Sequence, residues 1–272
     1  MTGKLEIGPD GRVTGPVAIT YNNPFPTRNG SWGSGAMMGV VMHTMVGNLQ
    51  PTTVDLFNSS SAAVSAHFGI AQDGSVWQFG PIGKGWIAWA EMAGNKAWYS
   101  IEHADDGNTE NPLTDAQLTA SAQLVEVLSR FAGFPLQVTD SVDIRGYGTH
   151  VMGGAAWGGH TCPGPGPRAG QRYEIISRAK AIRAGQVAWT SDGSLSLNEL
   201  AAQLKTEASS ILQMTAIHDG AFASGTAAYI NGVFAGTTSP AAAMPAGLVL
   251  WVPESLCGGG GQTPRGVRRN FS

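Results

Sequence analysis

Charged residues are scarce in this chain of 272 residues, making up 13% of it where a soluble domain typically has ~25%. The net charge is only −3, so we do not expect a nucleic-acid-binding protein, which normally carries a basic surface. The 2 cysteines are too few for a disulfide scaffold. No apolar run approaches the ~20 residues of a membrane span. The sequence starts without the apolar segment of a secretion signal, so we expect any role outside a cell to need another means of release.

Glycine, in contrast, is abundant. The chain has 38 glycines, about twice the usual share of ~7%, which predicts many loops and much packing of small residues. The hydrophobic content of 42% still allows a buried core and excludes global disorder.

Two short apolar runs rich in β-branched or aromatic residues predict buried strands. They are MGVVMHTMV at residues 38–46 and WYSIEHA at residues 98–104. The segments AHFGIA and SVWQFG flank Gln72-Asp73-Gly74, a turn sequence that predicts a hairpin.

Residues 114–133 show the clearest helical pattern. Thr114 and Gln117 fit a capping box, and Gly133 fits a helix end. The apolar face of this helix is expected to contain Leu118, Leu124, Val125, Leu128 and Phe131. A second helix is expected at about 169–184. Strands interleaved with helices predict an α/β fold, in which helices flank a central sheet.

The composition also suggests how the chain is divided. We expect an irregular N-terminal lead-in (1–35), a main domain (36–186), a linker (187–195) and a C-terminal region (196–272). That last region should contain a helix, a small β unit with a turn at Asn231-Gly232, and a flexible tail.

The predicted C-terminal helix begins with a capping box formed by Ser196 and Glu199. Leu197, Leu204 and Ile211 then recur every seven residues. This spacing fits either docking onto the main domain or formation of a homo-oligomer.

Three residues of the main domain suit a metal ion. His43 lies at the end of a predicted strand, His150 precedes a glycine-rich loop, and Cys162 ends that loop. Two imidazoles and one thiolate suit zinc and leave its fourth position open, as in a catalytic zinc site. The alternative from these residues alone is a core histidine, a loop histidine and a small buried thiol.

The segments VVMHTMVG, SAHFGIAQDGSVWQFG, AWAEMAGNKAWYSIEHAD and GTHVMGGAAWGGHTCPGP occur in this order. Together they resemble the zinc-dependent N-acetylmuramoyl-L-alanine amidases of the peptidoglycan-recognition-protein type, particularly endolysins of phages that infect actinobacteria. The resemblance spans about residues 37–184. It implies a mixed β-sheet flanked by helices. It also implies cleavage of the amide between N-acetylmuramic acid and L-alanine in bacterial peptidoglycan.

The resemblance also implies roles for single residues. His43, His150 and Cys162 match the zinc ligands. The glycine-rich segment Gly153–Gly159 is an insertion that makes His150 the least secure ligand, with His160 as its possible substitute. We assign His160 instead to stabilising the oxyanion, the role of the residue two positions before the cysteine in relatives.

A carboxylate must also accept a proton from the attacking water. Glu102 matches the catalytic glutamate of some relatives. Other relatives use a tyrosine where this chain has Ala66, so the resemblance assigns the role of general base to Glu102. The alternative is that Glu102 is only an exposed strand residue.

We expect Trp86, Trp89, Asn95 and Trp157 to line a groove for glycan and peptide, although any single tryptophan can instead serve packing. A histidine that relatives carry between the positions of Trp89 and Asn95 is absent here. His67 is expected to be structural, and Asp105-Asp106 to be a solvated strand end or, less simply, a cation site.

The resemblance leads to three functional hypotheses. The first is an endolysin that stays in the host cytoplasm until a holin opens the membrane and then degrades the cell wall. The second is a non-catalytic peptidoglycan-binding module, against which the retained Cys162 argues. The third is a tail-associated virion protein that penetrates the wall.

Overall fold

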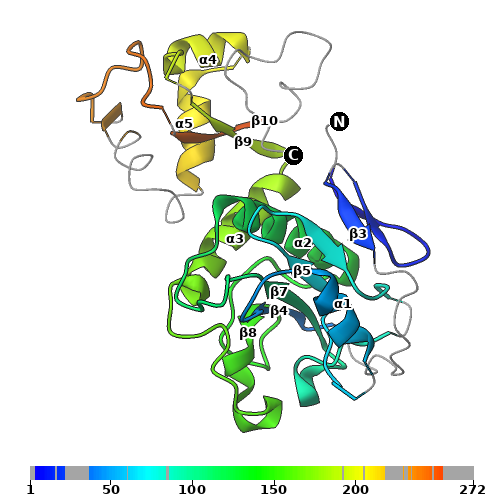
Figure 1. Cartoon of the computed structure of the whole chain (residues 1–272). Helices are drawn as coiled ribbons and strands as arrows, with labels where there is room; N and C mark the ends of the chain where they lie inside the picture. Colours follow the sequence, from blue (N-terminus) through cyan, green and yellow to red (C-terminus); the bar gives the residue numbers. More distant parts are fainter. Residues whose placement is uncertain are drawn as a thin grey trace. The chain divides into compact units, whose positions relative to one another are not determined.

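The computed structural model divides most of the chain into two compact units, and the boundary between them in the sequence lies between Ala179 and Lys180 (Figure 1). The described residues are 4–15, 17–21, 37–59, 61–83, 86–191, 193–204, 206–217, 229, 232–233, 235–246 and 248–253.

The first unit is built on a six-stranded sheet with the order β3-β6-β5-β7-β4-β8 (Figure 1). The strands are β3 (Ile19–Tyr21), β4 (Gly39–Thr44), β5 (Phe68–Ile70), β6 (Val76–Gln78), β7 (Trp98–His103) and β8 (Gly146–Thr149). Only β5 and β6 pair antiparallel among these six described strands, and the other neighbours are parallel. The predicted α/β fold with a mixed, mostly parallel sheet is confirmed.

The centre of the sheet is formed by the two runs that were predicted to be buried strands. Every residue of β4 is buried, and so is every residue of β7 except Glu102. Strands apolar on both sides need a cover on each face of the sheet. The predicted hairpin is also confirmed, because β5 and β6 flank a turn in which Gly74 has a φ of +84°.

Helices α2 (Asp115–Ala132) and α1 (Pro51–Asn58) cover opposite faces of this sheet (Figure 1). Helix α2 begins and ends as predicted: the Thr114 hydroxyl accepts the Gln117 N–H, and Gly133 closes the helix with a φ of 71°. Helix α1 was not predicted, since eight residues show too little periodicity.

The apolar face predicted for α2 is buried at Leu118, Leu124, Val125 and Leu128. Phe131 was wrongly included, because it is 51% exposed. Its ring covers Gly83 at the surface, where a β-carbon would come within 2.7 Å of it. Helix α3 (Arg168–Arg183) follows the site loop and begins one residue before the predicted start.

The N-terminal segment is more regular than predicted. Strands β1 (Glu6–Ile7) and β2 (Val13–Thr14) form a small antiparallel pair, and β3 forms the edge of the main sheet. The buried Gln78 anchors the segment: its side chain accepts from the Val13 N–H and donates to the Gly11 carbonyl. These strands of two or three residues are too short to show alternation, whereas the equally short β5 and β6 were predicted from the turn sequence between them. Residues 22–36 lie outside the described part.

The second unit contains β9 (Gln186–Thr190), α4 (Leu197–Gln203), α5 (Ala208–Ile217) and β10 (Val249–Pro253). Strand β10 lies in the region for which a small β unit was predicted, but its partner was not expected: β10 pairs antiparallel with β9, most of which lies in the predicted linker. The proposed turn residue Asn231 lies outside the described residues. The capping box of Ser196 and Glu199 is confirmed at the start of α4.

The single helix predicted for this region is in fact two, because α4 ends at Gln203 and α5 begins at Ala208. Leu197, Leu204 and Ile211 are at most 1% exposed. They pack with strand residues such as Leu250 in the core of their own unit. The seven-residue spacing therefore reflects packing within this unit, and these side chains are not available for self-association. None of the helices in the described ranges has the length and apolar character needed to cross a bilayer.

Two glycine substitutions test the packing of the first unit. A β-carbon at Gly39 would lie 1.7 Å from the Gly146 carbonyl oxygen, so Gly39→Ala must push β4 and β8 apart. We expect this substitution to lower the free energy of unfolding by ~1–3 kcal/mol or more. Gly170→Ala, in α3 with no neighbouring atom within 4 Å, should instead be neutral or stabilise by up to ~1 kcal/mol. Denaturant unfolding measures both, and unchanged stability of Gly39→Ala would contradict the strand pairing.

Candidate metal centre and active site

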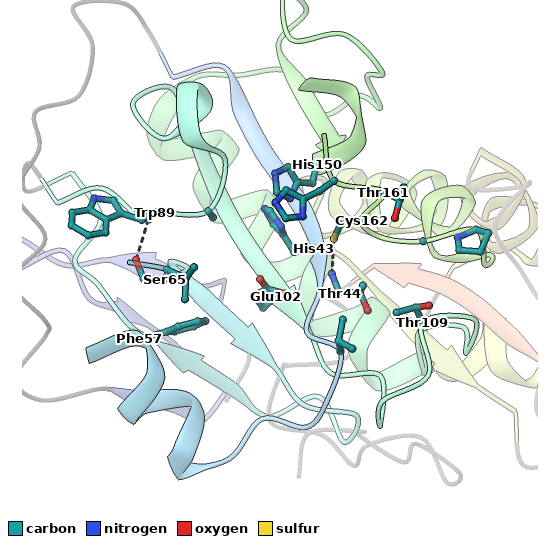
Figure 2. A pocket seen from close by; sticks show the side chains of 16 residues that line it. His43, Thr44, Phe57, Ser65, Trp89, Glu102, Thr109, His150, Thr161 and Cys162 are labelled. Carbon is teal, nitrogen blue, oxygen red and sulfur yellow. Dashed lines mark hydrogen bonds between the residues drawn. The ribbon is translucent and has the colours of Figure 1, made fainter. Parts of the chain in front are cut away.

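Three side chains that are distant in sequence meet at one edge of the main sheet. His43 lies near the C-terminal end of β4 and His150 directly follows β8. Since β4 and β8 are parallel neighbours, their C-terminal ends lie at the same edge. Cys162, from the loop before α3, completes the group, and the possible ligand atoms of all three lie within 4.8 Å of one another (Figure 2).

In each histidine of this group, the ring nitrogen Nε2, called the outer nitrogen below, takes part in a hydrogen bond. His43 Nε2 lies 3.0 Å from Oε1 of Glu91. His150 Nε2 donates to the carbonyl oxygen of Trp157 at 2.9 Å. In both rings, Nδ1 is therefore the nitrogen left for a metal ion, and the outer hydrogen bond orients the ring.

The sulfur of Cys162 also accepts a hydrogen bond. The backbone N–H of Thr44 donates to Sγ at 3.1 Å (Figure 2). The Thr44 hydroxyl donates to Asp105 Oδ2 at 2.7 Å and accepts from the buried Arg168 guanidinium at 3.2 Å. Arg168 also donates to the backbone carbonyls of His103 and Ala104 at the end of β7. This network fixes the strand ends against the loop that carries Cys162.

For Asp105, the two expectations of a solvated strand end and of a cation site are both wrong. It is fully buried. Its oxygens accept the Thr44 hydroxyl and the backbone N–H groups of Val46, Gly47 and Gly107. Of the two neighbouring aspartates, Asp106 is the exposed one.

The surroundings set the protonation of the two histidines. Burial by itself lowers the pKa of His43, but hydrogen bonding to Cys162 and Glu91 raises it well above the usual value. Burial, aided by the nearby charge of His43, lowers the pKa of His150 to about 4. His150 is therefore neutral at pH 7, which is the form that binds metals.

The donor set fits zinc. Two imidazoles and a thiolate are typical zinc ligands, and three protein ligands leave one position open for chemistry. His160 is not part of this group. Its exposed ring stacks on that of His150, with centroids 4.7 Å apart. The structure thus brings His150, and not its alternative His160, to the ligand cluster.

A pocket of about 380 Å³ opens beside the ligand group. His43, His150, His160 and Cys162 line one part of it, and Phe57, Val64, Ser65 and Trp89 line another. The backbone N–H of Trp89 is held by the Ser65 hydroxyl at 3.0 Å (Figure 2).

Glu102 lies between these two parts of the pocket (Figure 2). Because Glu102 of β7 is in register with His43 of β4, both side chains project from the same face of the sheet. Burial, assisted by the neighbouring Glu91 and Asp105 carboxylates, raises the pKa of Glu102 to about 7. Its Oε2 has no hydrogen-bond partner among the described residues. Such a carboxyl group can exchange a proton near neutral pH.

The predicted groove residues have different environments. Trp89 lines the pocket, whereas Trp86 and Trp157 are only 5% and 4% exposed. Trp157 packs edge-on against Trp98 in the core, and Asn95 Oδ1 accepts the backbone N–H groups of Ala90 and Glu91. Large aromatic rings gain most from complete burial, so of these three tryptophans only Trp89 keeps a position for substrate contact.

Two further histidines serve the core. The fully buried His67 contacts the Ser100 hydroxyl at 3.1 Å, in agreement with a structural role. His103, to which no role was assigned, joins the His43 carbonyl to the Ser121 hydroxyl of α2. Burial lowers the pKa of each to about 3, so both are neutral. His218 and Cys257 lie outside the described residues.

Sequence reasoning missed Glu91, the carboxylate behind His43. It is 0% exposed although it lies in a loop next to the 3₁₀ turn η1 (Met92–Gly94). The only signal was the changed stretch between Trp89 and Asn95, where a histidine of relatives was noted as absent. A glutamate in a loop ordinarily faces solvent, so its burial could not be inferred.

Comparison with known proteins agrees with this geometry. Residues 34–165 match the family model described as N-acetylmuramoyl-L-alanine amidase. The chain carries an amidase domain of this family. The matched segment includes all three residues of the ligand group and ends before α3. No curated protein matches the amidase chain.

Several solved structures are similar to the amidase. The hydrolase AmiA of Staphylococcus aureus, in complex with its ligand, is 16% identical, with a TM-score of 0.48, and the alignment covers 62% of this chain and 85% of that one. The PlyG catalytic domain is 19% identical, with a TM-score of 0.44 and coverages of 60% and 93%. The amidase LysC from Clostridium intestinale URNW is 18% identical, with a TM-score of 0.37 and coverages of 54% and 89%.

Zinc binding distinguishes the two candidate histidines. His150→Ala removes one of the three clustered ligands, and we expect it to lose most bound zinc. His160→Ala should keep zinc, because its ring only stacks on His150. Metal analysis after gel filtration measures both. Loss of zinc from His160→Ala with retention in His150→Ala would reverse the assignment.

Proposed function

We propose that this amidase hydrolyses the bond between N-acetylmuramic acid and L-alanine in bacterial peptidoglycan, with zinc held by His43, His150 and Cys162. The observation that carries the proposal is the convergence of these residues beside a pocket, within the segment that matches the amidase family. The donor set supports catalysis over a purely binding role, because among the described residues the cluster has three possible protein ligands and not the four of a closed structural site.

When bound, zinc acts as a Lewis acid toward the amide carbonyl and lowers the pKa of a coordinated water to about 7. Glu102 is the proposed general base. It faces the pocket beside His43, and its raised pKa suits a group that takes a proton from the attacking water. The same carboxyl group then returns the proton to the leaving amine of L-alanine.

His160 is proposed to stabilise the developing oxyanion. Its ring lies at the pocket and stacks on His150, so it can present an N–H to the substrate without being a ligand. Electrostatic stabilisation by a preorganised donor is often the largest contribution to such a reaction.

Trp89 is proposed to contact the glycan or the stem peptide. It lines the pocket, and its position is fixed by Ser65. Indole faces suit the apolar faces of sugar rings.

We further propose that the biological role is that of a phage endolysin acting on actinobacterial walls, held in the host cytoplasm until a holin opens the membrane. The order of sequence segments described above supports this role. Its alternative is a virion protein that penetrates the wall. Detection of the chain in purified virions, and not only in lysates, would favour that alternative.

The reaction itself is tested by mass analysis of digested actinobacterial cell walls. We expect new free amino groups on L-alanine, and activity that is lost on chelation and restored by zinc. New reducing sugar ends would indicate a glycosidase and contradict the proposal.

Cys162→Ser should lose most zinc and nearly all activity, because a hydroxyl is a poor replacement for a thiolate.

The role of Glu102 is tested with Glu102→Gln. We expect zinc to be retained and turnover to fall by roughly 10²–10⁴-fold, the usual contribution of a general base. In the parent enzyme, the rate should rise as the pH increases through about 7, because only the ionised carboxylate accepts a proton. An unchanged rate in the variant would exclude Glu102 as the base.

A further inference from the structure

Glu91 is a buried carboxylate that the proposed reaction does not use. Its side chain is 0% exposed, and it does not line the pocket. Oε1 lies 3.0 Å from His43 Nε2, on the side of the ring away from the remaining nitrogen Nδ1. Oε2 has no hydrogen-bond partner in the described part of the chain.

Burying a carboxylate is costly unless it is paired and hydrogen-bonded. For Glu91 the compensating side chain is the His43 ring. A group of this kind contributes little to stability by itself, because its desolvation offsets much of the attraction. Its geometry therefore indicates a role toward His43.

The loop that carries Glu91 is built to hold it in this position. Asn95 Oδ1 accepts the backbone N–H of Glu91 at 2.6 Å. A β-carbon at Gly94 would lie 2.6 Å from the Trp157 ring and 2.9 Å from Glu91 Cβ, so only glycine allows this close packing. Trp157 belongs to η2 (His150–Trp157), and its carbonyl oxygen holds His150. The same contact between η1 and η2 therefore supports the outer hydrogen bonds of both histidines.

We propose that Glu91 is a positioning residue that orients His43 with Nδ1 toward Cys162 and thereby strengthens the metal site. A carboxylate on the outer nitrogen fixes the tautomer of a ligating histidine and makes the ring a better ligand. The inference rests on the zinc site of the proposed function. It gives the two carboxylates near His43 separate tasks, since Glu102 faces the pocket and Glu91 lies behind the ring.

The test is the zinc affinity of the full chain, measured by competition with a chromophoric chelator. Glu91→Ala should bind zinc about 10–100-fold more weakly, the usual effect of losing such a partner. Glu91→Gln keeps an oxygen that can accept from Nε2 but lacks the charge, so its affinity should fall between those of the parent and Glu91→Ala.

Glu126→Gln is the matched control. Glu126 is also a buried glutamate, but it pairs with Arg130 on α2, away from the ligand group. We expect this variant to bind zinc like the parent, even if it is less stable. With cobalt in place of zinc, the visible spectrum should change in the Glu91 variants and not in the control, because only they alter the ligating ring.

The outcomes separate the two proposals. A parent that binds no zinc would overturn the proposed function. A parent that binds zinc, with folded Glu91 variants of equal affinity and unchanged cobalt spectra, would overturn the role of Glu91 alone. Circular dichroism establishes folding. If Glu91→Ala does not fold, the nearly isosteric Glu91→Gln decides: weaker zinc binding than in the control supports the inference, and equal binding overturns it.

Discussion

The site depends on the parallel pairing of β4 with both β7 and β8. This pairing brings the C-terminal ends of the strands to one edge of the sheet. It places Glu102 beside His43 and lets the chain leave β8 directly into His150. Gly39 and Gly146 pair where β4 and β8 begin, and they allow these strands to approach this closely. A side chain at Gly39 would collide with the backbone of Gly146. The geometry of the ligand group is thus a consequence of backbone hydrogen bonding at the centre of the sheet.

A chain with few charges concentrates several of them near this edge. Glu91 lies behind His43, Glu102 faces the pocket, and Asp105 is occupied by hydrogen bonds from the chain after β4. The same chemical group therefore occurs in three environments, which differ in hydrogen-bond partners and in solvent access. The buried Arg168 donates to the Thr44 hydroxyl and to backbone carbonyls at the end of β7.

The glycine-rich segment after His150 is more than an insertion between two ligands. It folds into η2, whose last residue supplies both a carbonyl acceptor for His150 and an indole ring for the core. One residue, Trp157, thus links the packing of the sheet to the orientation of the His150 ring. The second unit, in contrast, has a core of its own, formed by α4, α5 and β10.

Local sequence determined the elements whose signals are local. The apolar runs predicted β4 and β7, and the capping residues predicted the limits of α2. The group of His43, His150 and Cys162 was implied by the resemblance to the amidase family, because the residues alone left a structural alternative open. Tertiary structure alone decided which tryptophans are buried, that β10 pairs with the predicted linker, and that Glu91 lies behind His43. These features depend on contacts between residues far apart in the chain. Whether a carboxylate or an indole faces solvent is settled by what packs against it, and no local pattern of residues contains that information.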